Sequence, residues 1–234
     1  MDGAGKSEEV IQRILQIREK CICVRGNREK YIIKGMPTIV HDEKVKVSQE
    51  QLERNKWIKD NLSSISKKFI VSLPKENLIE AFNKKIYMVH YPMDSEMSFK
   101  RHIKVANLQE NEEMFEGVNA DIYLYGHTHV EVYNKSSDKY YINPGALGCP
   151  GETDEAPYGI LEINENSVIY KQLKTHYNVQ KVIKEIEKLS FPGYKHVLKI
   201  FYGNRVTYES CSQSRGKIRF IFIDSWRVKT TLLL

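Results

Sequence analysis

The sequence lacks any long apolar segment. No run approaches the roughly 18 consecutive apolar residues that a membrane-spanning helix requires, and the N-terminal stretch Met1–Lys6 has no apolar signal segment. We therefore expect a chain that works in the cytoplasm without membrane contact.

Cysteine is also scarce. The chain has four, and Cys21 and Cys23 are separated by one residue, which is not a zinc-knuckle spacing. Reduced thiols packed as small apolar side chains are the expected state.

Charge of one sign is not concentrated anywhere in the chain. The net charge is +6, from 36 Lys and Arg against 30 Asp and Glu, and the basic residues are spread along the sequence. This balance allows attraction to a phosphate-bearing small molecule, but it favours an ordinary solvated surface over a specific nucleic-acid-binding face. With 41% hydrophobic residues among 234, the chain can form one domain, expected at residues 1–203. The C-terminal tail, 204–234, has only the β-prone run Ile218–Ile223 as a clear feature.

Apolar periodicity predicts a mixed α/β chain. Apolar residues at helical spacing predict helices at 7–17, 48–62, 108–115, 179–189 and 194–202. Short apolar runs predict strands at 20–25, 85–89 and 120–125, and hairpins joining 130–133 to 140–142 and 158–163 to 168–173. The segment 65–78, interrupted by Pro74, fits neither pattern.

Two histidines follow the most apolar of these strands. Gly126 ends the strand, and His127 and His129 come next with one residue between them. In extended backbone such residues point the same way, so both imidazoles are expected to face one spot, and imidazole is a common metal ligand. Two solvent-facing loop histidines are the alternative. The two histidines follow the carboxyl end of a buried strand, where α/β sheets place their ligand sites, and this position favours a metal site over solvent-facing histidines.

Other strand ends carry polar groups too. Asn27 follows Gly26, His90 ends the 85–89 strand, and Asn143 ends a hairpin. An amide oxygen with imidazoles suits manganese, iron, nickel or zinc better than calcium. Taken alone, Asn27 could be an ordinary turn residue, and His90 could be a core histidine. Their shared position at strand ends favours a ligand role for both.

In this order, Gly26-Asn27, His90, Gly126-His127-Thr128-His129 and Asn143-Pro144-Gly145 resemble the signature of the calcineurin-like metallophosphoesterase superfamily, nearest its small prokaryotic phosphodiesterase branch. The resemblance covers about Ser7 to Gly203. It implies an αββα sandwich with a dinuclear centre of divalent transition metal, manganese first, with iron, nickel or zinc as alternatives. Asn27, His90 and His127 would bind one metal and His129 the other.

The chain departs from this family pattern at two places. The family's Asp-x-His and Gly-Asp motifs are absent, so we expect an N-terminally incomplete fold without most ligands of the first metal. Arg28 stands where many members have a histidine that assists the leaving group. A guanidinium can bind phosphoryl oxygens but is a poor acid at neutral pH, which favours phosphodiester over phosphomonoester substrates.

These features predict a metal-dependent phosphoesterase with Asn27, Arg28 and His127 as catalytic residues. The expected substrate is a small phosphate ester, either a phosphodiester or a dinucleoside polyphosphate, with activity impaired by the missing ligands. The alternative is a non-catalytic scaffold, the role of the retromer subunit in this family. The strands at 21–24 and 86–89 would become open edges without their family neighbours. We therefore expect self-association or marginal stability, unless the tail packs on them.

Overall fold

A computed structural model describes residues 4–40, 43–94, 98–203, 205 and 231–232. The predicted strand at Ile218–Ile223 lies outside these described residues, as does Cys211. The cysteines at 21, 23 and 149 are free thiols.

A five-stranded sheet forms the centre of the fold. Its order is β4-β5-β6-β8-β7, with β5, β6 and β8 parallel and the two outer strands antiparallel to their neighbours. The carboxyl ends of β5 and β6 therefore meet at one edge of the sheet, where side chains that follow them can converge. The strands are β4 (Glu76–Ala81), β5 (Lys84–Val89), β6 (Ile122–Leu124), β7 (Glu131–Lys135) and β8 (Tyr140–Pro144).

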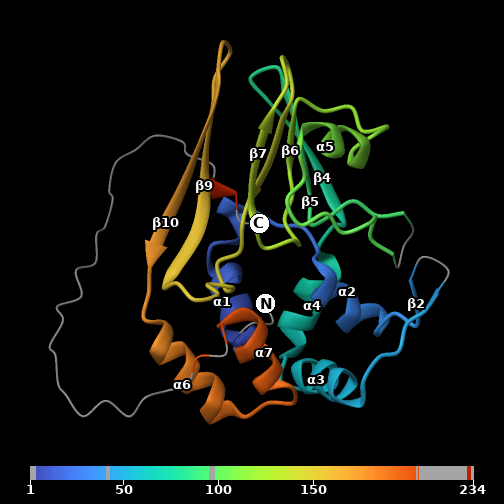
Figure 1. Ribbon diagram of the computed structural model, residues 1–234, viewed down its shortest axis with the longest axis vertical. Helices are drawn as coiled ribbons and strands as arrows, with labels where there is room; N and C mark the ends of the chain where they lie inside the picture. The colour runs from blue at the N-terminus through green and yellow to red at the C-terminus, as the bar shows by residue number, and fades with distance from the viewer. Residues whose placement is uncertain (1–3, 41–42, 95–97, 204, 206–230, 233–234) are drawn as a thin grey trace, which may run out of the picture.

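Two layers cover the faces of this sheet (Figure 1). The hairpin of β9 (Glu155–Ile163) and β10 (Val168–His176) packs on one face of the sheet, where it contacts the apolar cluster that includes Met88, Ile122 and Ile142. Helix α5 (Leu108–Met114) covers the other face, where the core is aromatic. This arrangement confirms the predicted α/β sandwich of the metallophosphoesterase type.

The remaining helices gather below the sheet in Figure 1 and form two further apolar clusters. One cluster joins α1 to α4 around Ile11 and Ile70, and the other packs α6 and α7 around Phe191 and Trp57. Among the described residues, no helix is long and apolar enough to cross a membrane. The helices are α1 (Ser7–Gln16), the short 3-10 helix η1 (Arg18–Lys20), α2 (Asn27–Lys34), α3 (Gln49–Asp60), α4 (Ser64–Ser72), α6 (Val179–Leu189) and α7 (Tyr194–Phe201).

The prediction of an open edge at 86–89 is wrong. Strand β5 lies inside the sheet because β4 pairs with it along six residues. The two strands are joined by Phe82 and Asn83, which have φ angles of 52° and 57°, as the tight turns of hairpins require. Phe-Asn is not the usual sequence for such a turn. The segment 65–78 fitted no single pattern because it contains most of helix α4 and the start of β4.

The first predicted strand is shorter than expected. Only Cys21–Ile22 forms β1, which pairs in parallel with β11 (Thr231–Leu232), so the end of the tail does cover this strand. The segment from Asn27, which was expected to be a turn, begins helix α2. A separate two-stranded piece is formed by β2 (Ile39–Val40) and β3 (Glu43–Lys44).

Helix α1 is tied to α4 by Glu8, which gives a testable pH dependence. Its carboxylate accepts hydrogen bonds from the Ser63 backbone N–H at 3.0 Å and from the Gln12 amide at 2.9 Å. Burial opposes ionisation, but the hydrogen bonds lower the pKa of Glu8 to about 2. A carboxyl group with a depressed folded-state pKa stabilises the fold above its ordinary pKa of 4.5, and the effect is lost as pH falls toward 2.

We therefore expect Glu8→Gln to lower the melting temperature at neutral pH, with the difference shrinking as the pH is taken below the ordinary carboxyl pKa. Thermal melts followed by circular dichroism across this range measure it. Glu9→Gln, at an exposed position on the same turn, is the matched control. A Glu8→Gln difference that does not change with pH would contradict the explanation.

Candidate metal centre

The first ligand candidate, Asn27, opens helix α2. Its position is set by Gly26, whose backbone N–H donates to Glu29 Oε2 at 2.7 Å and so fixes the helix start. A Cβ at Gly26 would lie 2.8 Å from that carboxylate oxygen and 3.3 Å from the His90 ring. A side chain at this position would therefore displace the Glu29 carboxylate and crowd the His90 ring.

Asn27, His90 and His127 meet at one point, as the sequence predicted. His90 follows β5 and His127 follows β6, the two parallel strands whose carboxyl ends are neighbours. His90 Nε2 lies 3.1 Å from Asn27 Oδ1 and 3.2 Å from His127 Nδ1. The Gly126 N–H donates to the His90 carbonyl at 2.9 Å and ties the two strand ends together.

The chemistry of these three atoms fits a metal ion. Ligand atoms about 2.1 Å from one metal are separated by roughly 3.0–3.4 Å in octahedral or tetrahedral geometry, which includes both measured distances. With neutral rings, His90 Nε2 and His127 Nδ1 each either carry a proton or present a lone pair, and the Asn27 oxygen presents only lone pairs. A proton on His90 Nε2 can serve both contacts, whereas a proton on His127 leaves His90 Nε2 and the Asn27 oxygen as two facing acceptors. A cation satisfies all three lone pairs together.

The histidines of the site are held in their neutral form. Burial, helped by the nearby His127, lowers the pKa of His90 to about 3. Burial and the neighbouring His102 lower the pKa of His127 to about 4, and the same two causes lower that of His129. Neutral imidazole is the form that binds metal.

His129 departs from the predicted arrangement. The expectation of extended backbone is wrong, because His127 and His129 have φ angles of 72° and 61°, in the left-handed region. His129 turns to Cys149, whose Sγ lies 3.2 Å from its Nδ1, and its ring packs near Phe201. It therefore borders a separate hollow that also contains Glu131 and Lys174. Its role as a ligand of a second metal stays a prediction.

Asn143 holds the histidine loop from beneath. It is fully buried, and its amide donates to the Gly126 carbonyl at 3.1 Å and to Thr128 Oγ1 at 2.9 Å. Its oxygen accepts from the Gly145 N–H at 3.0 Å. The predicted fourth loop thus lies beside the site, where it fixes the backbone that carries His127.

Three residues at the site were missed by sequence reasoning. Tyr91 and Phe99 both pack against the His127 ring, with ring centroids at 5.0 and 4.8 Å, and they also contact each other, with centroids 6.3 Å apart. Lys30 is buried on α2, with Nζ 3.9 Å from the centre of the Phe99 ring. Burial and the charge of Lys75 lower the pKa of Lys30 to about 8. Lys30 comes one helical turn after Asn27, so predicting α2 would have placed both on one face.

Arg28 lies on the same first turn, with its guanidinium 5.9 Å from the Tyr31 ring centre. In the part of the chain that the structure describes, no group of three His, Cys, Asp or Glu side chains could hold a metal. The convergent set at this site contains two histidines, and its third member is an amide.

Solved structures share this fold. Hypothetical protein PH1004 from Pyrococcus horikoshii OT3 superposes with a TM-score of 0.69, covering 83% of this chain and 78% of that one at 16% identity. A metallophosphoesterase from Sphaerobacter thermophilus gives a TM-score of 0.55, with 78% and 76% covered, also at 16% identity.

Sequence comparison finds a short match to a curated protein and a match to a family over most of the chain. Phosphodiesterase YfcE of Escherichia coli K12 is 37% identical over 49 residues, which is 21% of this chain and only 27% of YfcE. The calcineurin-like phosphoesterase superfamily domain matches residues 3–166, well over half of the chain. The family match, the shared fold and the convergence of Asn27, His90 and His127 agree, and the chain belongs to the calcineurin-like phosphoesterase superfamily.

Proposed function

We propose that the protein is a metal-dependent phosphoesterase that hydrolyses a phosphodiester or a dinucleoside polyphosphate. The observation that carries the proposal is the convergence of three candidate ligand atoms. His90 Nε2 lies 3.1 Å from Asn27 Oδ1 and 3.2 Å from His127 Nδ1. Manganese is the first expectation for this amide and imidazole set, with iron, nickel or zinc as alternatives. YfcE, which matches a short part of the chain, is a phosphodiesterase.

The roles of the site residues follow from their chemistry. A bound divalent metal polarises a phosphoryl oxygen and lowers the pKa of a water. Asn27, His90 and His127 would hold that ion, and Asn143 fixes the loop that positions His127. Arg28, beside Asn27 at the start of α2, would contact phosphoryl oxygens through its planar guanidinium. Because this group does not release a proton at neutral pH, the leaving group must be a good one without acid assistance.

The experiment is hydrolysis of bis-p-nitrophenyl phosphate by the full chain, dialysed against chelator and then supplied with manganese. We expect slow release of nitrophenolate that requires the metal and stops on adding EDTA. Absence of hydrolysis with manganese, iron, nickel and zinc, on this ester and on diadenosine tetraphosphate, would overturn the proposal.

Metal content measured on the same samples serves as the control for the site. We expect at most one weakly held transition metal per chain, because the three convergent ligands are neutral. Two tightly held metals after dialysis would show that further ligands complete a dinuclear centre.

A second candidate function is a non-catalytic scaffold with this fold. It is favoured by the absence, among the described residues, of a carboxylate-containing metal group. Metal binding without hydrolysis of any phosphate ester would support it over the enzyme.

A further inference from the structure

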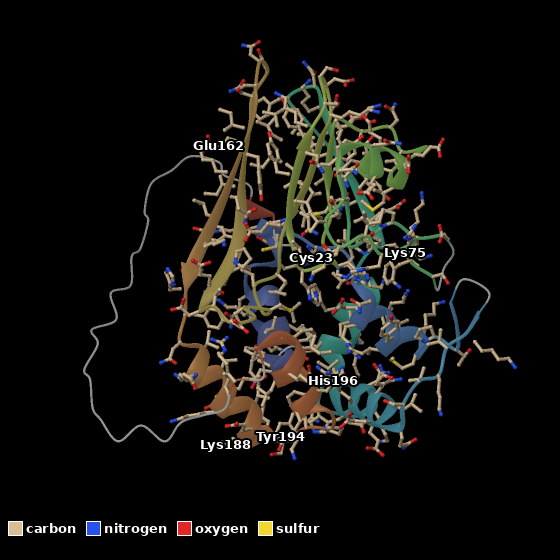
Figure 2. The ribbon with its side chains drawn as sticks, viewed as in Figure 1. Cys23, Lys75, Glu162, Lys188, Tyr194 and His196 are labelled. Atoms are coloured by element: carbon tan, nitrogen blue, oxygen red, sulfur yellow. The ribbon has the colours of Figure 1, made fainter. Side chains whose placement is uncertain are left out.

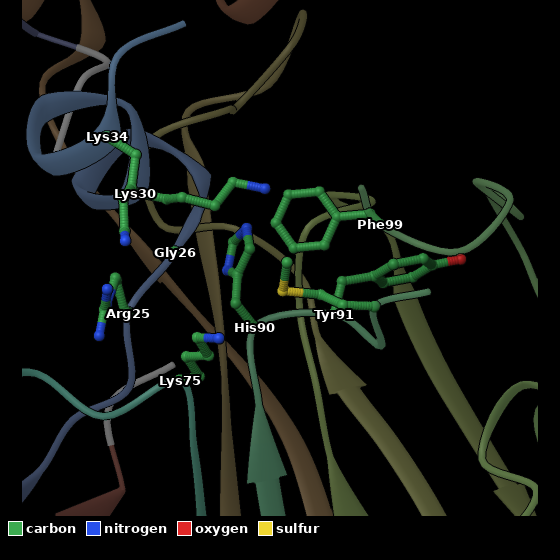
Figure 3. A pocket seen from close by; sticks show the side chains of 9 residues that line it. Arg25, Gly26, Lys30, Lys34, Lys75, His90, Tyr91 and Phe99 are labelled. Atoms are coloured by element: carbon green, nitrogen blue, oxygen red, sulfur yellow. The ribbon is translucent and has the colours of Figure 1, made fainter. Parts of the chain in front are cut away.

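A basic pocket lies against the candidate metal centre, bordered by the His90 ring and by the aromatic side chains of Tyr91 and Phe99. Four cationic side chains from three segments of the chain line it, and Figure 3 shows Arg25, Lys34 and Lys75 on one side of the His90 ring, with Lys30 reaching past that ring toward Phe99. None of its described lining residues is acidic. We call it the basic pocket, and it is lined by Arg25, Gly26, Lys30, Lys34, Lys75, His90, Tyr91, Met93 and Phe99.

The fold holds these cations in place. The Arg25 guanidinium donates two hydrogen bonds to the Leu73 carbonyl, at 2.9 and 3.2 Å, and the Arg25 N–H donates to the Pro74 carbonyl. Lys75 follows directly, so its backbone is tied to Arg25. Lys30 and Lys34 are four residues apart on α2 and share one helix face.

A partly buried space lined by charges of one sign concentrates the electric field and attracts an anion. The positive field acts on Lys30, whose pKa is lowered by burial and by Lys75. Lys34 and Lys75 are exposed at the rim, while Lys30 is buried. Figure 2 places Lys75 where the sheet meets the lower helices, open to solvent.

The basic pocket and the metal centre are joined through shared residues. Gly26 and His90 line the pocket, and His90 Nε2 is also the central atom of the metal-binding set. A group bound in the pocket therefore lies next to whatever is bound at the metal. The enclosed space is small, about 20 Å³, which exceeds the roughly 10–15 Å³ that one water needs but excludes a nucleobase.

We propose that the basic pocket binds a second phosphoryl group of the substrate, beside the one at the metal, so that the chain prefers polyphosphate esters over simple phosphodiesters. This inference rests on the proposed function, since it names the substrate of that site. The shared chemistry is a phosphoryl anion with at least one full negative charge, contacted by Lys34 and Lys75 at the rim and by Arg25 and Lys30 behind them.

The test compares two substrates and two variants in the full chain. Lys34→Ala and Lys75→Ala are each expected to lower kcat/KM for diadenosine tetraphosphate by roughly 10–100-fold, the worth of a charged hydrogen bond. The loss on bis-p-nitrophenyl phosphate, which has no second phosphoryl group, should be at least several-fold smaller. Lys85→Ala removes the same charge at the opposite end of β5 and is the matched control. Equal losses on both substrates would overturn the proposal.

A binding measurement separates this inference from the proposed function. Calorimetric titration of tripolyphosphate in EDTA needs no metal and no turnover. We expect the wild type and Lys85→Ala to bind it and the two rim variants to bind at least about tenfold more weakly. Binding without hydrolysis of any ester would overturn the proposed function and leave an anion pocket. Binding that is equal in all variants would overturn the pocket.

Free phosphate is the other source of the same chemistry, and it gives a different result. If inorganic phosphate changed the rate on bis-p-nitrophenyl phosphate in the wild type but not in Lys75→Ala, the pocket would be an effector site, and the substrate assignment would be overturned. We expect no such Lys75-dependent effect.

Discussion

Replacing His90 by alanine is expected to lower metal affinity by at least about 100-fold, because loss of a direct ligand should exceed the 10–100-fold typical of an outer-shell change. His90 Nε2 contacts both Asn27 Oδ1 and His127 Nδ1, so its removal takes away the central atom of the proposed ligand set. Hydrolysis of phosphodiesters should fall in parallel. Manganese titration by calorimetry and the chromogenic assay measure the two effects.

His196→Ala is the matched control for His90→Ala. His196 is exposed on α7 and lies among the lower helices in Figure 2, so its loss removes an imidazole without touching the site. His90→Gln keeps an oxygen ligand in nearly the same place and should retain more metal affinity than alanine. If His90→Ala bound manganese as the wild type does, while remaining folded, the metal would not be at this point.

How much of this site could be predicted from the sequence depends on which contacts set the position of each residue. The predicted closeness of His90 and His127 followed from strand order, because β5 and β6 are parallel neighbours whose carboxyl ends meet. Asn27 is brought there by the start of α2, outside the central sheet. His129 could not be placed, since its direction depends on two left-handed histidine backbones. Left-handed geometry in a non-glycine residue costs about 1–3 kcal/mol and persists only when its surroundings impose it. Those surroundings are long-range contacts, which spacing along the chain does not show.

The basic pocket was missed for a related reason. Helix α2 has no regular apolar stripe over the eight residues from Asn27 to Lys34, and its start is set by the Gly26–Glu29 hydrogen bond. Read as a turn, the segment gave no reason to join Lys30 with Asn27. Arg25 and Lys75, fifty residues apart, are brought together by hydrogen bonds from Arg25 to the Leu73–Pro74 backbone. The fold class, in contrast, followed from local apolar patterns that the structure repeats in β5, β6 and both hairpins.

The second large effect is expected for Asn143→Ala, which acts on the site through the loop that carries His127. The substitution leaves the Gly145 N–H and the Thr128 hydroxyl without their buried partner. Each unsatisfied buried group costs about 1–3 kcal/mol, so we expect the free energy of unfolding to fall by about 2–4 kcal/mol. Urea titration measures it. Asn164→Ala, which removes an exposed turn amide oxygen with two similar acceptor bonds, is the control and should cost far less.

The same substitution should also reach the metal. The left-handed backbone at His127 and His129 is held by the Asn143 contacts to Gly126 and Thr128, so releasing them lets His127 move from its position 3.2 Å from His90. An outer-shell loss of this kind typically lowers metal affinity 10–100-fold. If Asn143→Ala is too unstable to titrate, Thr128→Val removes one of the contacts alone, with a smaller stability loss. A Thr128→Val chain that bound manganese with wild-type affinity would show that Asn143 supports the fold without positioning His127.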